Sequence, residues 1–415
     1  MQINRRELLA GFGGLAVTEA LAQTQSSIPS AKTFPRKNDF AIPPGLTYIN
    51  GAYTHPLPVA AVEAQRQYSE RRARPGGIDA PGNAALVKAV KEEFAALINA
   101  KPAEISFIPN TSTGENLVFN SLGIVGSGGN VVTDALHFEG AIIHLQALQR
   151  ERGLDLRMAM PRAKDSDGRI EMRDLERLVD KKTKLVEVSL VAMYNGFQHD
   201  LKAVCDLAHA HGAYVYADIV QAAGATPIDV RASGVDFCAC SSFKWLMGDF
   251  GAGFLYARED LLPRIHRSQH GYHSVTDVTT HFLPYDPPAK TPFTWELGTD
   301  ASMTFEVGSY AYAPLAALSV SLPYIRNLGV ERIEAQRQPL LERLRKEMPR
   351  LGFEPITPAG TKSALITFLV KDRQPVFERL QKANVNVRLA EHYMRVSPSV
   401  YNDMQDVERL LEALS

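Results

Sequence analysis

The sequence predicts an α/β fold. A large domain with a mostly parallel, seven-stranded-type sheet is followed by a smaller α+β C-terminal domain. The chain has 415 residues, which is too long for one hydrophobic core. Short apolar runs alternate with helical patterns from about residue 105 to 258, as in a parallel sheet covered by helices. After a long polar stretch, helix and strand patterns alternate again from about residue 330.

The first 22 residues have the layout of an export signal. Arg5-Arg6 precedes a weakly apolar stretch from Leu8 to Val17, and Ala20-Leu21-Ala22 fits a small-x-small cleavage site. The arginine pair, with leucines just behind it, resembles a twin-arginine signal. We therefore expect export by the twin-arginine machinery and a periplasmic location. Residues 23–44, rich in Ser, Pro, Lys and Thr, are predicted to form a linker or N-terminal arm.

The large domain is predicted to span residues 45–325. It opens with a short strand at 45–50, and helical patterns follow at 58–74 and 84–99. Helices then alternate with strands, and one of these helices closes at Gly212. The strands expected after residue 100 read EISFIPN, GNVVTD, LDLRMAM, KLVEVSLVAM, AYVYAD, VDFCACSS and GAGFLYAR.

Residues 265–295 form a long polar stretch with little periodicity. Such a stretch is typical of a lid, a binding loop or an interface segment. Its histidines and Tyr272 can shape a substrate pocket, or the whole segment can serve only a dimer interface. The small domain is predicted at 326–415, with contributions from the N-terminal segment.

Charge and cysteine content exclude several classes of partner. The formal net charge is −1, so no basic excess suggests nucleic acid or an anionic membrane. No apolar run of about 18 residues follows the signal, so no membrane span is expected. The three cysteines, Cys205, Cys238 and Cys240, provide neither a disulfide framework nor a Cys₄ metal site, and we expect them to be buried. No metal site is predicted.

Lys244 lies just after a strand that reads as buried, which is an unusual setting for a lysine. Asp218 ends an earlier strand, and Ser112 and Thr113 precede a helix whose N-terminal amides can hold an anion. Ligands of parallel sheets bind beyond the carboxyl ends of the strands. An amine, a carboxylate and a phosphate cradle together indicate pyridoxal 5′-phosphate (PLP) as cofactor.

The segment YADIVQAAGATPIDVRASGVDFCACSSFKWLMGDFGAGFLY resembles fold-type I PLP enzymes of the class V aminotransferase family. This group includes cysteine desulfurases, kynureninases and isopenicillin N epimerase-like proteins, and the resemblance covers roughly residues 45–413. It implies that Lys244 forms the Schiff base with the cofactor. It also implies that Asp218 pairs with the pyridine nitrogen and that Gln221 reaches the ring hydroxyl oxygen.

The resemblance further implies how the phosphate is held. In NTSTGEN, Ser112 and Thr113 would bind it, and Ser241 would add a hydroxyl. In WELGT, Thr299 matches a residue that reaches the phosphate of the other subunit. We therefore expect a homodimer with shared active sites.

Two further residues match ring-stacking and substrate-binding positions. Phe138 lies where an aromatic or histidine side chain stacks on the ring, with its neighbour His137 as the alternative. Arg395, in YMRVSPSVYN, matches the arginine that pairs with the substrate carboxylate, a task that suits a guanidinium fork.

The expected function is PLP chemistry at the α-carbon of an amino acid or an amine-bearing peptide. The resemblance leaves epimerase, aminotransferase and lyase open, and an isopenicillin N epimerase-like enzyme is among the candidates. The region NVNVRLAEHYMRVSPS contains no cysteine before Arg395, so we do not expect a persulfide-forming cysteine desulfurase. The rival hypothesis is a catalytically silent binding protein that has kept the PLP fold.

Overall fold

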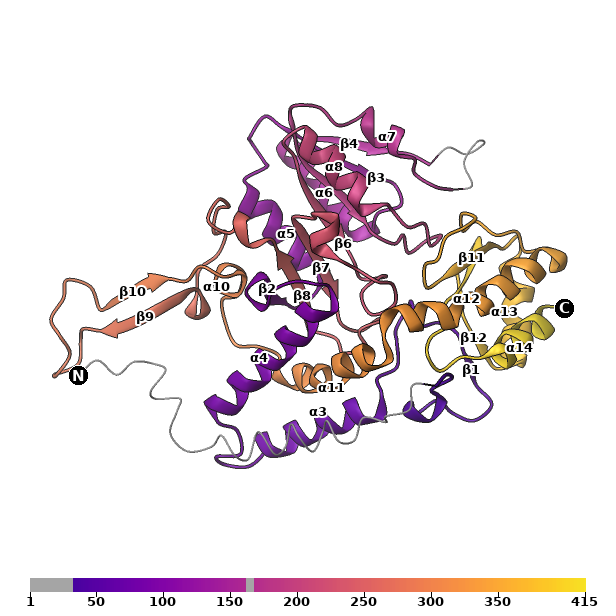
Figure 1. Ribbon diagram of the computed structural model, residues 1–415, viewed down its shortest axis with the longest axis horizontal. Helices are drawn as coiled ribbons and strands as arrows, with labels where there is room; N and C mark the ends of the chain where they lie inside the picture. The colour runs from indigo at the N-terminus through magenta and orange to yellow at the C-terminus, as the bar shows by residue number, and fades with distance from the viewer. Residues whose placement is uncertain (1–32, 162–167) are drawn as a thin grey trace.

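The computed structural model describes residues 33–161 and 168–415 and is built around a seven-stranded sheet (Figure 1). The strand order is β2-β8-β7-β6-β5-β3-β4, and only β8 runs against its neighbours. The predicted fold class, α/β with a mostly parallel sheet, is confirmed. The strands are β2 (Ile105–Ile108), β3 (Asn130–Asp134), β4 (Asp155–Ala159), β5 (Thr183–Ser189), β6 (Tyr214–Asp218), β7 (Phe237–Ser241) and β8 (Gly253–Ala257).

Alternate residues of each strand point to opposite faces of this sheet, and apolar clusters bury both faces. Val186 and Val188 belong to one apolar cluster, whereas Leu185, the residue before Val186, belongs to another. Helices α4 and α8 contribute to the first cluster and α5 to the second. The helices of this part are α3 (Val59–Arg72), α4 (Ala80–Leu97), α5 (Thr111–Leu122), α6 (Glu139–Arg152), α7 (Met172–Glu176), α8 (Leu201–Ala210), α9 (Val230–Ser233), α10 (Ala301–Phe305) and α11 (Tyr312–Leu328).

The C-terminal part has its own antiparallel sheet, in the order β11-β14-β13, and its own apolar cluster. The N-terminal strand β1 pairs with β12, so the start of the described chain joins this part. Helix α11 includes residues 325 and 326, between which the sequence places the boundary of the two domains. That domain boundary stays a prediction. The elements are β1 (Thr47–Tyr48), α12 (Val330–Glu347), β11 (Ile366–Leu369), α13 (Arg373–Lys382), β12 (Val385–Asn386), β13 (Arg388–Leu389), β14 (Tyr393–Val396) and α14 (Met404–Leu414).

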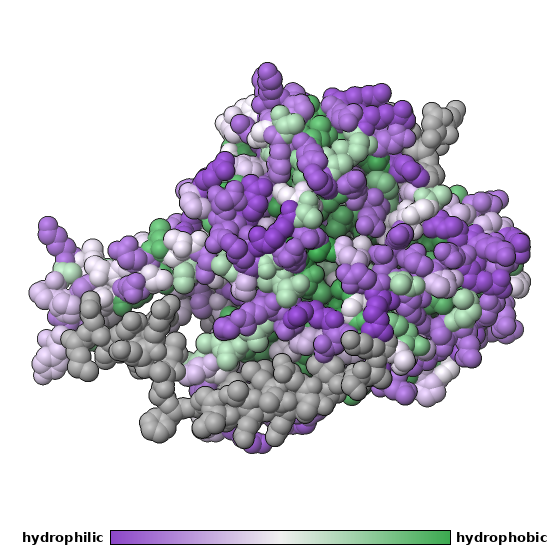
Figure 2. Space-filling model, viewed as in Figure 1, coloured by the Kyte–Doolittle hydropathy of each residue, from purple (hydrophilic) through white to green (hydrophobic). Residues whose placement is uncertain are grey.

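A β-hairpin projects from the body at the left of Figure 1. It consists of β9 (Val275–Thr280) and β10 (Phe293–Leu297), paired antiparallel. The sequence shows little periodicity here because all five residues of β10 are exposed, so neither face of this strand is buried. In Figure 2, apolar side chains interrupt the hydrophilic surface along the hairpin. Its exposed large apolar residues are Val278, Phe282, Leu283, Tyr285, Phe293, Trp295 and Leu297.

The predicted export signal, residues 1–22, and the first part of the predicted arm lie outside the described residues. Within residues 33–161 and 168–415, none of the helices combines the length and apolar character that crossing a bilayer requires.

Candidate active site

Lys244 follows β7 at the carboxyl edge of the sheet, and its side chain is buried. Burial lowers the pKa of its amine to about 8, although the nearby Asp218 carboxylate acts in the opposite direction. The charge of Arg395 adds to the lowering of this pKa. A lysine of this kind carries a substantial fraction of free amine near neutral pH, and the free amine is its nucleophilic and basic form.

The loop after Lys244 is held against the loop after β6 by close backbone contact. Gly224 adopts φ +88°, and a Cβ atom there would lie 2.5 Å from the carbonyl oxygen of Trp245. Only glycine fits this position without moving the backbone that carries Lys244. The backbone near Asp218 and the backbone near Lys244 are therefore fixed relative to each other.

Asp218 is the last residue of β6 and lies beside Ala239 of β7. Its carboxylate is buried and accepts a hydrogen bond from the N–H of Val220 at 2.8 Å. Burial raises the pKa of Asp218, while the charge of His137, the Val220 N–H and the charge of Lys244 act to lower it. The residues that follow Asp218 form turns rather than a helix.

The predicted phosphate cradle lies at the N-terminus of α5. The helix begins at Thr111, so Ser112 and Thr113 lie within its first turn rather than before it. Asn110, which sequence reasoning did not single out, is the N-cap, and its side chain accepts the Thr113 N–H at 2.9 Å. Ser241 accepts the Thr111 N–H at 3.0 Å and thereby joins the end of β7 to this helix. The helix N-terminus and these hydroxyls suit a phosphate.

Gln221 is buried close to the same place. Its side-chain nitrogen donates to the Ala52 carbonyl at 3.1 Å, and its oxygen accepts the Trp245 indole N–H at 3.0 Å. The amide nitrogen carries a second proton, which is the one available for the predicted contact with the ring hydroxyl oxygen.

Of the two ring-stacking candidates, His137 lies nearer to Asp218. The His137 imidazole is buried, its Nδ1 lies 2.8 Å from the Ser189 hydroxyl, and its charge affects the pKa of Asp218. Phe138 is partly exposed at the N-cap of α6, with its ring against Gly140. The geometry therefore favours His137 over Phe138 for contact with the cofactor.

Arg395 lies on β14 with its guanidinium buried. Its Nη1 donates to the Met193 carbonyl at 2.8 Å, while its Nε has no hydrogen-bond partner within the described part of the chain. Burial lowers the pKa of Arg395 to about 10, and Arg388, its cross-strand neighbour, adds to this effect. A buried guanidinium with an unsatisfied N–H is prepared to receive an anion.

Thr299 lies outside this group. It is exposed and sits between β10 and α10, at the base of the projecting hairpin. Its predicted contact with a phosphate in the other subunit concerns a second chain and stays a prediction.

The donor set fits PLP. Lys244 offers an amine of lowered pKa, Asp218 a buried carboxylate for a pyridinium nitrogen, and Arg395 an unsatisfied cation for a carboxylate. The electrostatic influence of Asp218 and Arg395 on Lys244 shows that these side chains lie close together. The N-terminus of α5, joined to β7 by Ser241, completes the site with a place for the phosphate.

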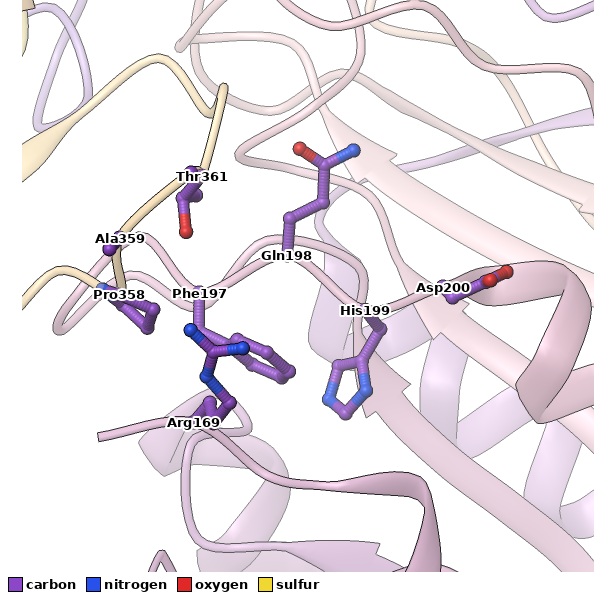
Figure 3. Close-up of a pocket in the computed structure, with 9 residues that line it drawn as sticks. Arg169, Phe197, Gln198, His199, Asp200, Pro358, Ala359 and Thr361 are labelled. Atoms are coloured by element: carbon purple, nitrogen blue, oxygen red, sulfur yellow. The ribbon is translucent and has the colours of Figure 1, made fainter. Parts of the chain in front are cut away.

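A separate surface pocket has a volume of about 320 Å³. It lies where the loop before α8 faces a loop that precedes β11 (Figure 3). None of the predicted site residues lines it, and we assign it no role in catalysis. The lining residues are Arg169, Phe197, Gln198, His199, Asp200, Pro358, Ala359, Gly360 and Thr361.

This constellation defines a PLP-dependent enzyme. Residues 47–410 match the family model described as aminotransferase class-V, and the chain belongs to this family. Its cofactor is pyridoxal phosphate.

Relatives across most of the chain are named for sulfur chemistry. A probable cysteine desulfurase of Methanothermobacter thermautotrophicus is 28% identical over 88% of this chain and 93% of its own length. The apo structure of a cysteine desulfurase from Thermococcus onnurineus superposes with a TM-score of 0.78 at 24% identity, covering 92% of this chain and 97% of that one. The cystine C–S lyase C-DES, solved with its reaction product cysteine persulfide, has a TM-score of 0.75 at 22% identity, covering 89% and 97%.

These relatives contradict the expectation that the protein is not a persulfide-forming cysteine desulfurase. That expectation rested on the lack of a cysteine before Arg395, but relatives that match most of the chain are named cysteine desulfurases. The physical reason for the error is that a persulfide needs a thiol acceptor, and that thiol need not be carried by the same chain. The named relatives point to sulfur chemistry rather than to an epimerase-like enzyme.

Proposed function

We propose that the protein cleaves the carbon–sulfur bond of L-cysteine, or of an amino acid derived from it, and delivers the sulfur as a persulfide on an external thiol. The observation that carries the proposal is the Lys244 amine, whose pKa is lowered to about 8 and which lies within the electrostatic reach of Asp218 and Arg395. Relatives named cysteine desulfurases over most of the chain support the choice of substrate.

The proposed roles in holding the cofactor follow from the positions described above. Asp218 keeps the pyridine nitrogen protonated, and Gln221 meets the ring hydroxyl oxygen. The N-terminus of α5, together with Ser112, Thr113 and Ser241, holds the phosphate. When bound, PLP supplies an electron sink that stabilises negative charge on the substrate α-carbon.

The chain's own side chains then orient the substrate and move its proton. The Arg395 guanidinium binds the substrate carboxylate through its unsatisfied N–H groups, which fixes the α-carbon relative to Lys244. The free amine of Lys244 takes the α-proton and, as an ammonium group, returns a proton to carbon. The balanced overall reaction converts cysteine and a thiol into alanine and a persulfide of that thiol.

The sulfur acceptor is external because the chain's own thiols are unsuited to the task. Cys205, Cys238 and Cys240 are buried within the core. Burial raises the pKa of Cys205 to about 12 and raises the pKa of the other two as well. Neutral, enclosed thiols do not act as nucleophiles, since the thiolate is the reactive form.

The test is to incubate the PLP-loaded protein with L-cysteine and dithiothreitol and to quantify alanine and released sulfur. We expect equal amounts of the two products, and neither with Lys244→Ala. Formation of pyruvate and ammonia instead of alanine would reassign the reaction to elimination. Turnover of other amino acids without any reaction of cysteine or cystine would overturn the proposal.

We also propose that the protein is a homodimer in which Thr299 reaches the partner's cofactor phosphate. The exposed apolar side chains of the β9–β10 hairpin support this, because a solvated hairpin seldom carries so many. Light scattering coupled to size exclusion tests the assembly, and a monomer at micromolar concentration would contradict it.

Export through the twin-arginine route is proposed from the first 22 residues alone. Cell fractionation of the full chain tests it, with Arg5→Lys and Arg6→Lys combined as the export-blocked comparison. Equal distribution of the two proteins between compartments would contradict the proposal.

A further inference from the structure

A second group of ionisable side chains lies buried next to His137. Glu187 comes from β5, Glu115 from α5 and His144 from α6. The His137 Nε2 lies 3.4 Å from a Glu187 carboxylate oxygen, and the His144 Nδ1 lies 2.6 Å from a Glu115 oxygen. Ligand-type atoms of His137, Glu115 and Glu187 all lie within 4.8 Å of one another. The four side chains therefore form one cluster.

Glu187 is the unusual member of this cluster. Its side chain is 0% exposed, and within the described residues neither of its oxygens accepts a hydrogen bond. The His137 Nε2 is likewise without a hydrogen bond. A buried carboxylate is costly unless a neighbouring charge or a proton compensates it. Among the described residues, His137 and His144 are the cations whose charge acts on Glu187.

The charges that surround His137 favour its protonated form. Burial by itself would lower the pKa of His137, but the Glu187 carboxylate beside it, with the charges of Glu115 and Asp218, outweighs this effect. The result is a pKa raised to about 9. Burial raises the pKa of the Tyr216 phenol on β6 well above its usual value, so this neighbour of the cluster stays neutral.

The outer end of the cluster reaches solvent. The His144 side chain is 17% exposed, whereas those of His137 and Glu187 are fully enclosed. Burial opposes the protonation of His144, but the Glu115 carboxylate more than offsets it and raises its pKa. Burial and the charge of Glu115 raise the pKa of Glu187 to about 7. The cluster thus places two carboxyl groups beside two imidazoles.

We propose that Glu187 and Glu115 are positioning residues that hold His137 as an imidazolium ion, and that His144 is the point at which this network exchanges protons with solvent. The imidazolium charge acts on Asp218, whose burial favours the neutral acid. A cation at position 137 keeps Asp218 ionised, which is the form that a pyridinium nitrogen requires. The inference deepens the proposed cofactor site and does not depend on the identity of the substrate.

A divalent metal ion is the competing occupant, because the cluster contains donor types that such ions use. One contact argues against it, because Glu115 is already paired with His144. The imidazoles of His137 and His144 lie beside the two carboxyl groups and can offset their charge without a metal ion.

The experiment measures histidine protonation in cofactor-free protein, so it is independent of turnover. The chain has 11 histidines, and ring ¹⁵N labelling with His137→Gln assigns the signal of interest. We expect His137 to be doubly protonated at pH 7.5 and to titrate near pH 9. Glu187→Gln should lower its pKa by about 1 or more, the effect expected from loss of an adjacent opposite charge. Glu115→Gln should lower the pKa of His137 by a smaller amount, and it should change the pKa of His144 more than that of His137.

Glu104→Gln is the matched control, since Glu104 is a buried carboxylate outside the cluster. It should leave the His137 titration unchanged. A neutral His137 in the unmodified protein at pH 7.5 overturns the proposal even if Glu187→Gln does not fold. Stoichiometric zinc that survives dialysis against a chelator and is lost in Glu115→Gln also overturns it, by assigning the cluster to a metal.

Discussion

Replacing Asp218 by asparagine should lower the pKa of Lys244, and replacing Arg395 by glutamine should raise it. Burial brings the pKa of this amine from 10.5 to about 8. At pH 7 roughly 300 times more of it is therefore in the free form than for an ordinary lysine. Asp218 favours the ammonium form and Arg395 disfavours it, so the two substitutions act in opposite directions. We expect each change to move the pKa by about 1, the order typical of a charge at close range.

The assay is the rate at which cofactor-free protein combines with PLP, followed by absorbance and plotted against pH. Since the free amine reacts, the rate should rise with pH and reach half its plateau near pH 8 in the unmodified protein. The midpoint should fall below this value in Asp218→Asn and rise above it in Arg395→Gln. Borohydride reduction and peptide mapping confirm attachment at position 244. A midpoint near 10, or shifts of both variants in the same direction, would refute the reasoning.

Ser241→Ala should weaken PLP binding by about 1 kcal/mol, measured by equilibrium titration, because it removes the acceptor of the Thr111 N–H at the start of α5. Gly224→Ala should destabilise the fold by about 2 kcal/mol in urea unfolding, since its Cβ would collide with the Trp245 carbonyl. The pKa of His137 is about 9 in the folded protein, against 6.5 for an ordinary histidine. Its contribution to stability should therefore be complete below pH 6.5 and lost as the pH rises through 9, which unfolding at several pH values will show. Trp295→Ser, on a side chain that is 50% exposed, should weaken dimer formation in light scattering without changing the circular dichroism spectrum.

Much of the site is predictable because parallel strands bring their carboxyl ends to one edge. Lys244, Asp218 and Ser241 each follow or end an apolar run, so their convergence follows from the strand pattern. Glu115 and Glu187 escape such reasoning, because they lie on different elements, α5 and β5, far apart in sequence. Only the structure shows that oxygens of the two carboxyl groups lie within 4.8 Å of each other.

The hairpin escapes for a different reason. Sequence periodicity reports burial within one chain, and all residues of β10 are exposed, so the pattern carries no signal there. The missing cysteine near Arg395 is equally uninformative about the reaction. It indicates which group receives the sulfur and leaves open whether the carbon–sulfur bond is broken.

The identity of the sulfur acceptor therefore leads to a final prediction. Only three residues separate β13 from β14, and none of them is a cysteine, so this connection offers no thiol beside Arg395. Sulfur release should then depend on the concentration of added thiol, rising with it until saturation. Intact-mass measurement during turnover should show no protein carrying an extra sulfur atom. Replacing all three cysteines by alanine or serine should leave the rate per folded chain unchanged. A persulfide trapped on Cys205, Cys238 or Cys240 would show that a core thiol becomes accessible and would contradict the external-acceptor proposal.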